Sequence, residues 1–172
     1  VQSMKQLVNE FRDYARLPAA ALQPLDLNAL VAEVLALYGQ AQEQGRLSAQ
    51  WAEGLPQILG DPTQLRQVIH NLLQNAQEAT DKTGRITVRL LREDGWAVVE
   101  IEDTGCGMDA DFVRDRLFKP FDSTKGLTGM GIGAYESREF IRALGGEIRV
   151  NSTPGAGSTF RVLLPCHDAQ GA

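Results

Sequence analysis

The chain of 172 residues is long enough for one domain with a substantial core, and its 43% hydrophobic and 23% charged residues are ordinary for a globular protein. A net charge of −5 excludes the basic footprint of a nucleic-acid-binding domain, and no apolar run approaches the ~18 residues of a membrane-spanning helix. Cys106 and Cys166 are too few for a disulfide framework and lack zinc-site spacing, so we expect reduced thiols in the cytoplasm.

Residues 1–18 carry a short heptad pattern. Apolar residues from Val1 to Ala15 recur at alternating spacings of three and four, and Pro18 ends the helix. The pattern predicts either an amphipathic helix packed on its own domain or the end of a longer helix that pairs in a bundle. Because the chain begins inside this pattern, we expect it to be a fragment of a longer protein.

The remaining elements do not alternate regularly between strand and helix. Asp26 or Asn28 caps the first of the following helices, and Asp61 followed by Pro62 is a strong start signal for the next. In chain order we expect a helix over 29–44, weakly extended segments within 47–58, a helix over 62–80, strands over 85–92 and 96–103, a short helix over 109–117, a helix over 133–144, and strands over 147–152 and 158–165. This order predicts an α+β fold: a two-layer sandwich with one mixed, mostly antiparallel sheet and helices on a single face.

The helix expected over residues 62–80 carries two asparagines on the border of its apolar face. At ~100° per residue, Asn75 lies about 40° around the helix from Asn71. The apolar stripe beside them consists of Leu65, Val68, Ile69, Leu72, Leu73, Ala76 and Ala79. A carboxamide oxygen is a hard ligand that suits Mg²⁺; two solvated or capping amides are the alternative. His70 lies on the other flank, where we expect a partly exposed residue rather than a ligand or phosphoacceptor.

Three glycines at alternate positions, Gly129, Gly131 and Gly133, precede the helix over 133–144. Backbone without Cβ atoms can approach a ligand closely, and free N–H groups at a helix start favour an anion such as phosphate. The P-loop pattern is absent, which excludes a P-loop nucleotide site. No strand directly precedes the glycines, which excludes the dinucleotide-binding fingerprint. The protein-kinase motifs are missing, which excludes that fold. Asp103-Thr104-Gly105 is the aspartic-protease triplet, but a protease would leave these glycines and the asparagine pair unexplained.

Five stretches occur in an order that is typical of one family. LRQVIHNLLQNAQEA resembles the N box, DTGCGM the first glycine box, LFKPFDSTK the F box, GLTGMGIGAYESREFI the second glycine box, and STPGAGSTF the last glycine–threonine element. Together they resemble the ATP-binding catalytic domain of sensor histidine kinases, in the GHKL superfamily with its Bergerat fold, over roughly residues 22–165. Residues 121–146 resemble sensor kinases of the PEP-CTERM/exosortase system and, more distantly, nitrogen-regulation kinases.

The resemblance implies an organisation and a set of partners. Residues 1–18 would be the C-terminal end of the dimerisation and phosphoacceptor helix, 22–166 the catalytic domain, and 167–172 a tail. ATP and Mg²⁺ would bind, and ADP would leave. The protein partners would be the phosphoacceptor domain of the same protein, its dimer mate and a downstream response regulator. The domain would be cytoplasmic, with the full-length protein anchored at the inner membrane.

The resemblance also implies roles for individual residues. Asp103 would accept a hydrogen bond from the adenine amine, Gly105 and Gly107 would let the backbone approach the ring, and Thr159 would support Asp103. Asn75 would hold Mg²⁺ with Asn71 beside the phosphates. The implied catalytic residues are Asn71, Asn75 and Lys125. The implied nucleotide-binding residues are Asn71, Asn75, Asp103, Gly105, Gly107, Met108, Phe121, Lys125, Thr128, Gly129, Met130, Gly131, Ile132, Gly133 and Thr159.

The segment between Met108 and Thr128 would form a lid held against the domain by Phe118 and Phe121. Lys125, within this lid, would either reach the γ-phosphate or remain solvated.

Asn71 also bears on the type of reaction. In the hydrolases and serine kinases of the superfamily, a glutamate at this position acts as general base. An amide cannot take a proton at neutral pH, whereas a histidine acceptor carries its own lone pair. The substitution therefore favours a histidine kinase over a GHKL-type ATPase or serine kinase, with a non-catalytic nucleotide-dependent interaction module as a further alternative. No histidine precedes His70, so we expect the chain to bind Mg·ATP without phosphorylating itself.

Overall fold

The computed structural model of the chain describes residues 21–119 and 133–167. Its elements, in chain order, are β1 (Gln23–Leu25), α2 (Leu27–Leu35), η1 (Ala36–Tyr38), α3 (Gly39–Glu43), β2 (Leu47–Gln50), β3 (Ile58–Gly60), α4 (Pro62–Ala79), β4 (Ile86–Glu93), β5 (Trp96–Asp103), α5 (Ala110–Asp115), α7 (Ala134–Ala143), β6 (Glu147–Thr153) and β7 (Gly157–Pro165). No helix in this part of the chain combines the length and apolarity that crossing a bilayer requires.

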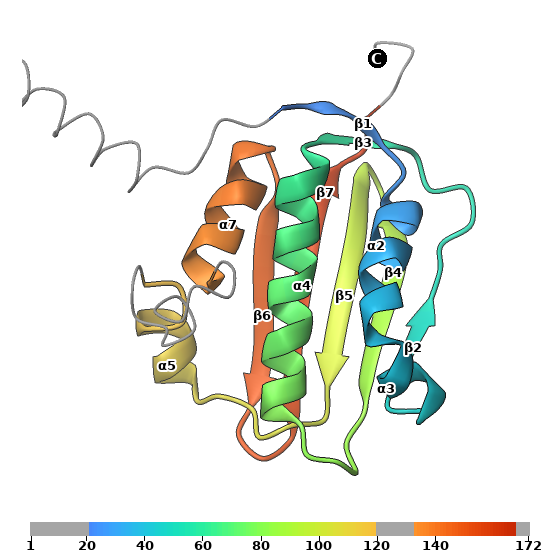
Figure 1. Ribbon diagram of the computed structural model, residues 1–172. Helices are drawn as coiled ribbons and strands as arrows, with labels where there is room; N and C mark the ends of the chain where they lie inside the picture. Colours follow the sequence, from blue (N-terminus) through green and yellow to red (C-terminus); the bar gives the residue numbers. More distant parts are fainter. Residues whose placement is uncertain (1–20, 120–132, 168–172) are drawn as a thin grey trace, which may run out of the picture.

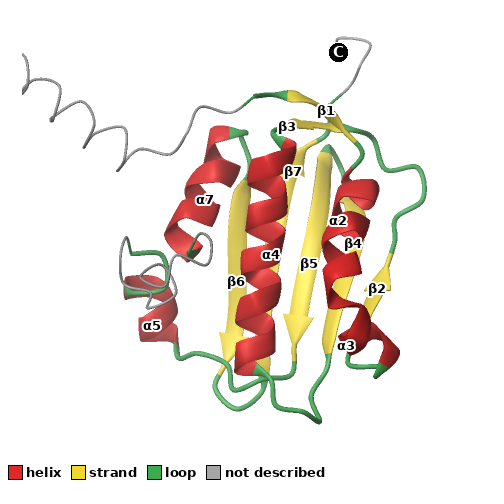
Figure 2. Cartoon of the chain, viewed as in Figure 1, coloured by secondary structure: helices red, strands yellow, loops and turns green. Residues whose placement is uncertain are grey.

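Five strands form the main sheet, in the order β2-β4-β5-β7-β6. Only the edge pair β2–β4 is parallel; the other three neighbours are antiparallel. Helices α2, α4 and α7 lie side by side over one face of this sheet (Figures 1 and 2). The predicted two-layer α+β sandwich with a mixed, mostly antiparallel sheet is therefore confirmed.

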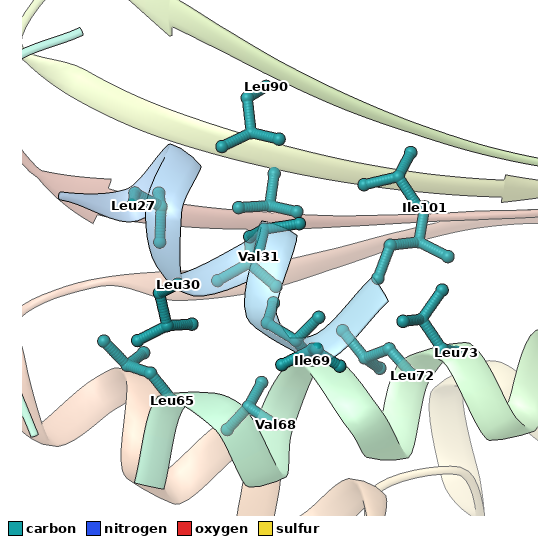
Figure 3. Close-up of a cluster of buried hydrophobic side chains, with 14 of the residues drawn as sticks. Leu27, Leu30, Val31, Leu65, Val68, Ile69, Leu72, Leu73, Leu90 and Ile101 are labelled. Atoms are coloured by element: carbon teal, nitrogen blue, oxygen red, sulfur yellow. The ribbon is translucent and has the colours of Figure 1, made fainter. Parts of the chain in front are cut away.

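The two faces of the sheet differ because successive side chains of a strand point to opposite sides. On the helix-free face, Glu100 pairs with both Arg89, at 3.3 Å, and Arg161, at 2.9 Å. The helix-covered face is apolar and packs against α2 and α4, as Figure 3 shows. The side chains labelled in that view are Leu27, Leu30, Val31, Leu65, Val68, Ile69, Leu72, Leu73, Leu90 and Ile101.

Helix α4 passes through the centre of the domain and starts where the sequence predicts. The Asp61 carboxylate caps it by accepting hydrogen bonds from the backbone N–H groups of Thr63 and Gln64, and Pro62 occupies its first turn. The other Asp61 oxygen accepts from the N–H of Ala21 at 2.8 Å. This hydrogen bond is the main reason that the pKa of Asp61 lies below its usual value. One buried carboxylate thus joins the start of α4 to the segment that precedes β1.

The structure differs from expectation near the N-terminal end of the domain. The helix expected over 29–44 is divided into α2, η1 and α3, because the buried face ends at Tyr38, Gly39 weakens the helix, and none of the residues of α3 is buried. Strand β1, which was not predicted, pairs with β3 in a separate two-stranded sheet. Three residues that include a proline are too few to show the alternation by which strands are recognised.

Candidate nucleotide-binding site

A cavity of about 450 Å³ opens beside α4 at the end of β5. It lies between the C-terminal half of α4, the loop after β5, the short helix α5 and the start of β7. Among the described residues, it is lined by Asn71, Asn75, Glu78, Ala79, Asp103, Cys106, Gly107, Met108, Phe112, Arg116, Leu117, Ala134, Ser158 and Phe160. Its predominantly apolar wall, with a few convergent polar groups, is typical of a small-molecule site.

Asp103 is the buried acid of this cavity. It is the last residue of β5, on the helix-covered face, and is 4% exposed. Its Oδ1 accepts a hydrogen bond of 2.9 Å from the N–H of Gly105. Burial raises the pKa of the Asp103 carboxyl, and the N–H groups of Gly105 and Ser158 oppose that rise without cancelling it. The result is a partly desolvated acceptor that a donor group on a ligand can satisfy.

The first glycine box packs against the protein's own backbone. A Cβ atom at Gly105 would lie 2.2 Å from the carbonyl oxygen of Ala79, and one at Gly107 would lie 2.0 Å from that of Thr153. Gly107 also has a φ of +70° and lines the cavity. We expected these glycines to admit the adenine ring. Their immediate role is to let the loop after β5 close onto α4 and the β6–β7 turn, which forms the cavity wall.

Both asparagines of α4 line the cavity, as the helical spacing predicts. Asn71 is 3% exposed, and its Nδ2 donates a hydrogen bond of 3.0 Å to Ser137 Oγ on α7. Asn75 lies one turn further on and is partly exposed. These amides fit Mg²⁺, because an amide oxygen is a neutral hard ligand and Mg²⁺ usually completes its shell with waters and phosphate oxygens.

Ser158 occupies the place that the sequence interpretation gave to Thr159. Thr159 lies on the helix-free face of the sheet, opposite Glu102 and Asn151, and is not among the described residues that line the cavity. Ser158 pairs with Asp103 across β5 and β7 and does line it. The signal was present in the sequence, since alternation along β7 places Ser158 on the same face as the buried Phe160.

Ser158 also belongs to a hydrogen-bonded group that holds the first glycine box. Its hydroxyl lies 2.7 Å from that of Ser152 on β6, and Ser152 Oγ accepts from the N–H of Met108 at 2.7 Å. Met108, which was expected at the nucleotide site, is thereby fixed at the cavity wall. Ser152 was not identified from the sequence.

Part of the expected site can be placed at the start of α7. Gly133 precedes this helix, but its N–H donates to the Glu136 carboxylate at 3.1 Å. In this structure, that N–H is therefore directed to the protein rather than to a ligand. Phe118 of the F box lies against α7, with the Arg138 guanidinium 4.7 Å from its ring centre. The expected site residues outside the described part of the chain are Phe121, Lys125, Thr128, Gly129, Met130, Gly131 and Ile132.

Several residues that line the cavity were missed by the sequence analysis. Phe112, Arg116 and Leu117 come from α5 and the residues just after it, and Cys106 from the first glycine box. Glu78 follows Asn75 on the same side of α4. The helical period places Glu78 near the asparagines, whereas nothing in the sequence predicts how α5 folds against the cavity.

His70 is a partly exposed residue away from the cavity, as predicted. Its Nδ1 lies 2.7 Å from the Tyr38 hydroxyl, and the two ring centres are 5.7 Å apart. Burial raises the pKa of Tyr38 to about 12, so the phenol keeps its proton at neutral pH and can donate it to the imidazole. The contact ties η1 to α4 and gives His70 a structural role.

We expect His70→Ala to lower the free energy of unfolding by about 1 kcal/mol, the usual contribution of one hydrogen bond, and to leave ATP affinity unchanged. Urea denaturation and calorimetric titration of the same preparation measure the two quantities. A loss of nucleotide binding without a loss of stability would contradict this structural role.

An α+β sandwich with an acid at the base of an apolar cavity and paired amides on the central helix defines a nucleotide-binding domain of GHKL type. Residues 60–168 match the family described as Histidine kinase-, DNA gyrase B-, and HSP90-like ATPase, and the chain belongs to this family. The resemblance inferred from the five sequence boxes is thereby confirmed. The narrower assignment to the PEP-CTERM/exosortase group stays a prediction.

Individual relatives are sensor kinases. The signal transduction histidine-protein kinase AtoS of Escherichia coli (strain K12) is 34% identical over 168 residues, which are 96% of this chain and 27% of AtoS. The chain thus spans about a quarter of the length of that relative.

Solved structures of histidine kinases share the fold. The catalytic domain of ThkA is 26% identical with a TM-score of 0.71, covering 84% of this chain and 97% of that domain. Full-length ShkA in complex with AMPPNP is 27% identical with a TM-score of 0.73, covering 97% of this chain and 36% of ShkA. ThkA has also been solved with the response regulator TrrA, where the likeness is 22% identity with a TM-score of 0.74 over 96% of this chain and 48% of that chain, and concerns the fold.

Proposed function

We propose that this chain is the ATP-binding catalytic domain of a two-component sensor histidine kinase, which transfers the γ-phosphoryl group of ATP to a histidine outside this chain. The observation that carries the proposal is the position of Asp103, buried at the base of a cavity whose wall also contains Asn71 and Asn75. The acid at the end of β5 can select a base while the amides on α4 face the triphosphate.

Base selection follows from hydrogen-bonding type. An ionised carboxylate only accepts hydrogen bonds, and adenine presents an exocyclic amine that donates. Guanine presents a carbonyl oxygen at the equivalent ring position, and two acceptors would then face each other in a partly desolvated site. Asp103 therefore favours ATP over GTP, and the apolar side chains of Met108, Leu117 and Phe160 line the same cavity.

The polar residues of α4 suit phosphoryl transfer by positioning. Mg²⁺ bound beside Asn75 would offset the negative charge of the triphosphate. Asn71 occupies the place of the general base found in the hydrolases of this superfamily, and its amide cannot accept a proton at neutral pH. The domain would accordingly hold the triphosphate against an acceptor that needs no deprotonation, which is how a neutral histidine nitrogen reacts.

The partners and the location belong to the same proposal. The acceptor histidine would lie on a dimeric phosphoacceptor domain of the full-length protein, and the phosphoryl group would pass on to a response regulator. The catalytic domain would face the cytoplasm of a protein anchored at the inner membrane. The kinase relatives and the solved complex of ThkA with a response regulator support the response-regulator partner. The dimer mate and the location stay predictions.

A calorimetric titration tests the proposal directly. We expect the chain to bind Mg·ATP and to bind Mg·GTP at least about tenfold more weakly, the loss that one mismatched hydrogen bond produces. The complex should transfer γ-labelled phosphate to an added phosphoacceptor domain in acid-labile form, whereas the chain alone should remain unlabelled.

The same experiment separates the alternatives. Steady release of inorganic phosphate by the chain alone would indicate an ATPase, and acid-stable label would indicate a serine kinase. Nucleotide binding without transfer to any supplied phosphoacceptor domain would indicate an interaction module controlled by its ligand.

A further inference from the structure

A buried polar contact joins α4 to α7 beside the cavity. Asn71 Nδ2 donates to Ser137 Oγ at 3.0 Å, and the two residues are 3% and 0% exposed. The neighbouring buried residues of α7, Phe140 and Ile141, are apolar and need no such partner. A fully buried hydroxyl costs free energy unless it is hydrogen-bonded. A serine at this buried position is therefore explained by its hydrogen bond to the Asn71 amide rather than by apolar packing between the helices.

The contact leaves the accepting end of the Asn71 carboxamide available to a ligand. An asparagine amide has a donating nitrogen and an accepting oxygen, and a rotation of its terminal group exchanges them. With Nδ2 held by Ser137, the oxygen is the atom left to face the cavity that Asn71 lines. An oxygen can bind a cation or its hydrating water, whereas an N–H₂ group turned to the same place would repel the cation.

We propose that Ser137 is a positioning residue for the metal-bound triphosphate, acting by accepting the hydrogen bond of Asn71 Nδ2 while the carboxamide oxygen faces the cavity. The inference rests on the proposed function and adds a residue outside the cavity lining. Ser137 lies on the first turn of α7, whose first residue, Ala134, lines the cavity. The same hydrogen bond thus couples the asparagine of the N box to the helix that follows the second glycine box.

Threonine and valine at position 137 separate this role from packing. The two side chains have nearly the same shape, so both add one methyl group to a site that is 0% exposed. Threonine keeps a hydroxyl for Asn71, whereas valine leaves the amide nitrogen without it. Any difference in Mg·ATP affinity between Ser137→Thr and Ser137→Val therefore measures the contribution of the hydroxyl.

We expect S137V to bind Mg·ATP about tenfold more weakly than S137T, since one hydrogen bond to a buried group corresponds to roughly that factor. Both variants should bind adenosine equally, because adenosine reaches Asp103 and carries no phosphates. In an Asn71→Ala background the two variants should bind Mg·ATP equally. Calorimetric titration of the full chain measures all of these affinities.

The outcomes distinguish the two proposals. Failure of the wild-type chain to bind Mg·ATP would overturn the proposed function itself. If the wild type binds Mg·ATP and the S137T and S137V variants bind it with equal affinity, Ser137 has a packing role only. The same conclusion follows if S137V loses adenosine binding in parallel with Mg·ATP binding. If the added methyl group prevents folding of both variants, Ser137→Ala compared in the wild-type and N71A backgrounds gives the same test, and equal losses in the two backgrounds would overturn the inference.

Discussion

Replacing Asp103 by asparagine is expected to weaken ATP binding by about ten- to a hundredfold, the effect of losing a hydrogen bond to a charged group. The loss follows from the second task of this side chain. Asp103 Oδ1 already accepts from the N–H of Gly105. An asparagine would keep its oxygen for that donor and turn its N–H₂ group toward the ligand, so a donor would face the adenine amine. The same N–H₂ group would suit the carbonyl of guanine, and the ratio of ATP to GTP affinity should fall.

Titration of ATP and GTP against Asp103→Asn and the wild type measures both effects. Asp94→Asn is the matched control, because Asp94 is an exposed turn residue with a φ of 55°, a conformation that asparagine adopts readily. It should leave both affinities unchanged. If the Asp103→Asn chain retained its ATP affinity, Asp103 would not be part of the ATP-binding site.

The same substitution should not destabilise the fold at a pH where Asp103 is ionised. Because burial raises the pKa of Asp103 in the folded chain, the folded state favours the protonated form. That contribution to stability is present below about pH 4, the usual aspartate value, and is lost as the pH rises through the raised pKa. Above that raised pKa the ionised group lowers the free energy of unfolding, and D103N lacks this penalty. Urea denaturation across this range should show D103N gaining stability relative to the wild type as the pH rises.

This sign explains why the fold retains a buried acid that weakens it. An asparagine would satisfy the backbone donors of the loop at lower cost, so the charge is not needed for structure. The buried charge is accounted for by a ligand that donates a hydrogen bond to the ionised carboxylate. The same pKa predicts that ATP affinity decreases on acidification at a higher pH than an ordinary aspartate would allow, since the protonated acid no longer only accepts.

The sequence predicted those parts of the site that depend on local rules. The cap at Asp61 and the 3.6-residue period of α4 were sufficient to place Asn71 and Asn75 together on one flank of the helix. Asp103 was identified through the resemblance of the first glycine box, and its position at the end of a predicted β-strand fits that assignment. In each case the relevant geometry is contained within one element and its flanking residues.

What the sequence did not predict depends on how distant elements meet. Ser158 and Ser152 acquire their roles from the pairing of β6 with β7, and Ser137 from the packing of α7 against α4. Residues of α5 enter the cavity wall because of where a loop folds back. Alternation along β7 assigns Ser158 to the buried face, but the hydrogen-bond partners of these hydroxyls are set by tertiary packing and carry no signal in the sequence.

A large loss of stability from a conservative change is expected at Gly107. Alanine there would have to adopt a φ of +70° and place its Cβ 2.0 Å from the carbonyl oxygen of Thr153. The left-handed conformation alone costs about 1–2 kcal/mol. Forcing the loop away from the β6–β7 turn adds about 1–3 kcal/mol. We expect Gly107→Ala to lose about 2–5 kcal/mol in all, a large part of the stability of a domain, and to weaken ATP binding because Gly107 lines the cavity.

Gly155, in the turn that Gly107 contacts, provides the comparison. Its φ is +77°, yet a Cβ atom there would meet nothing within 4 Å. Gly155→Ala should therefore lose only the conformational part, about 1–2 kcal/mol, and keep the wild-type ATP affinity. Urea unfolding and ATP titration of the two variants separate backbone conformation from contact. Equal losses of stability would show that the positive φ requires glycine at position 107, and that close packing against Thr153 does not hold the first glycine box in place.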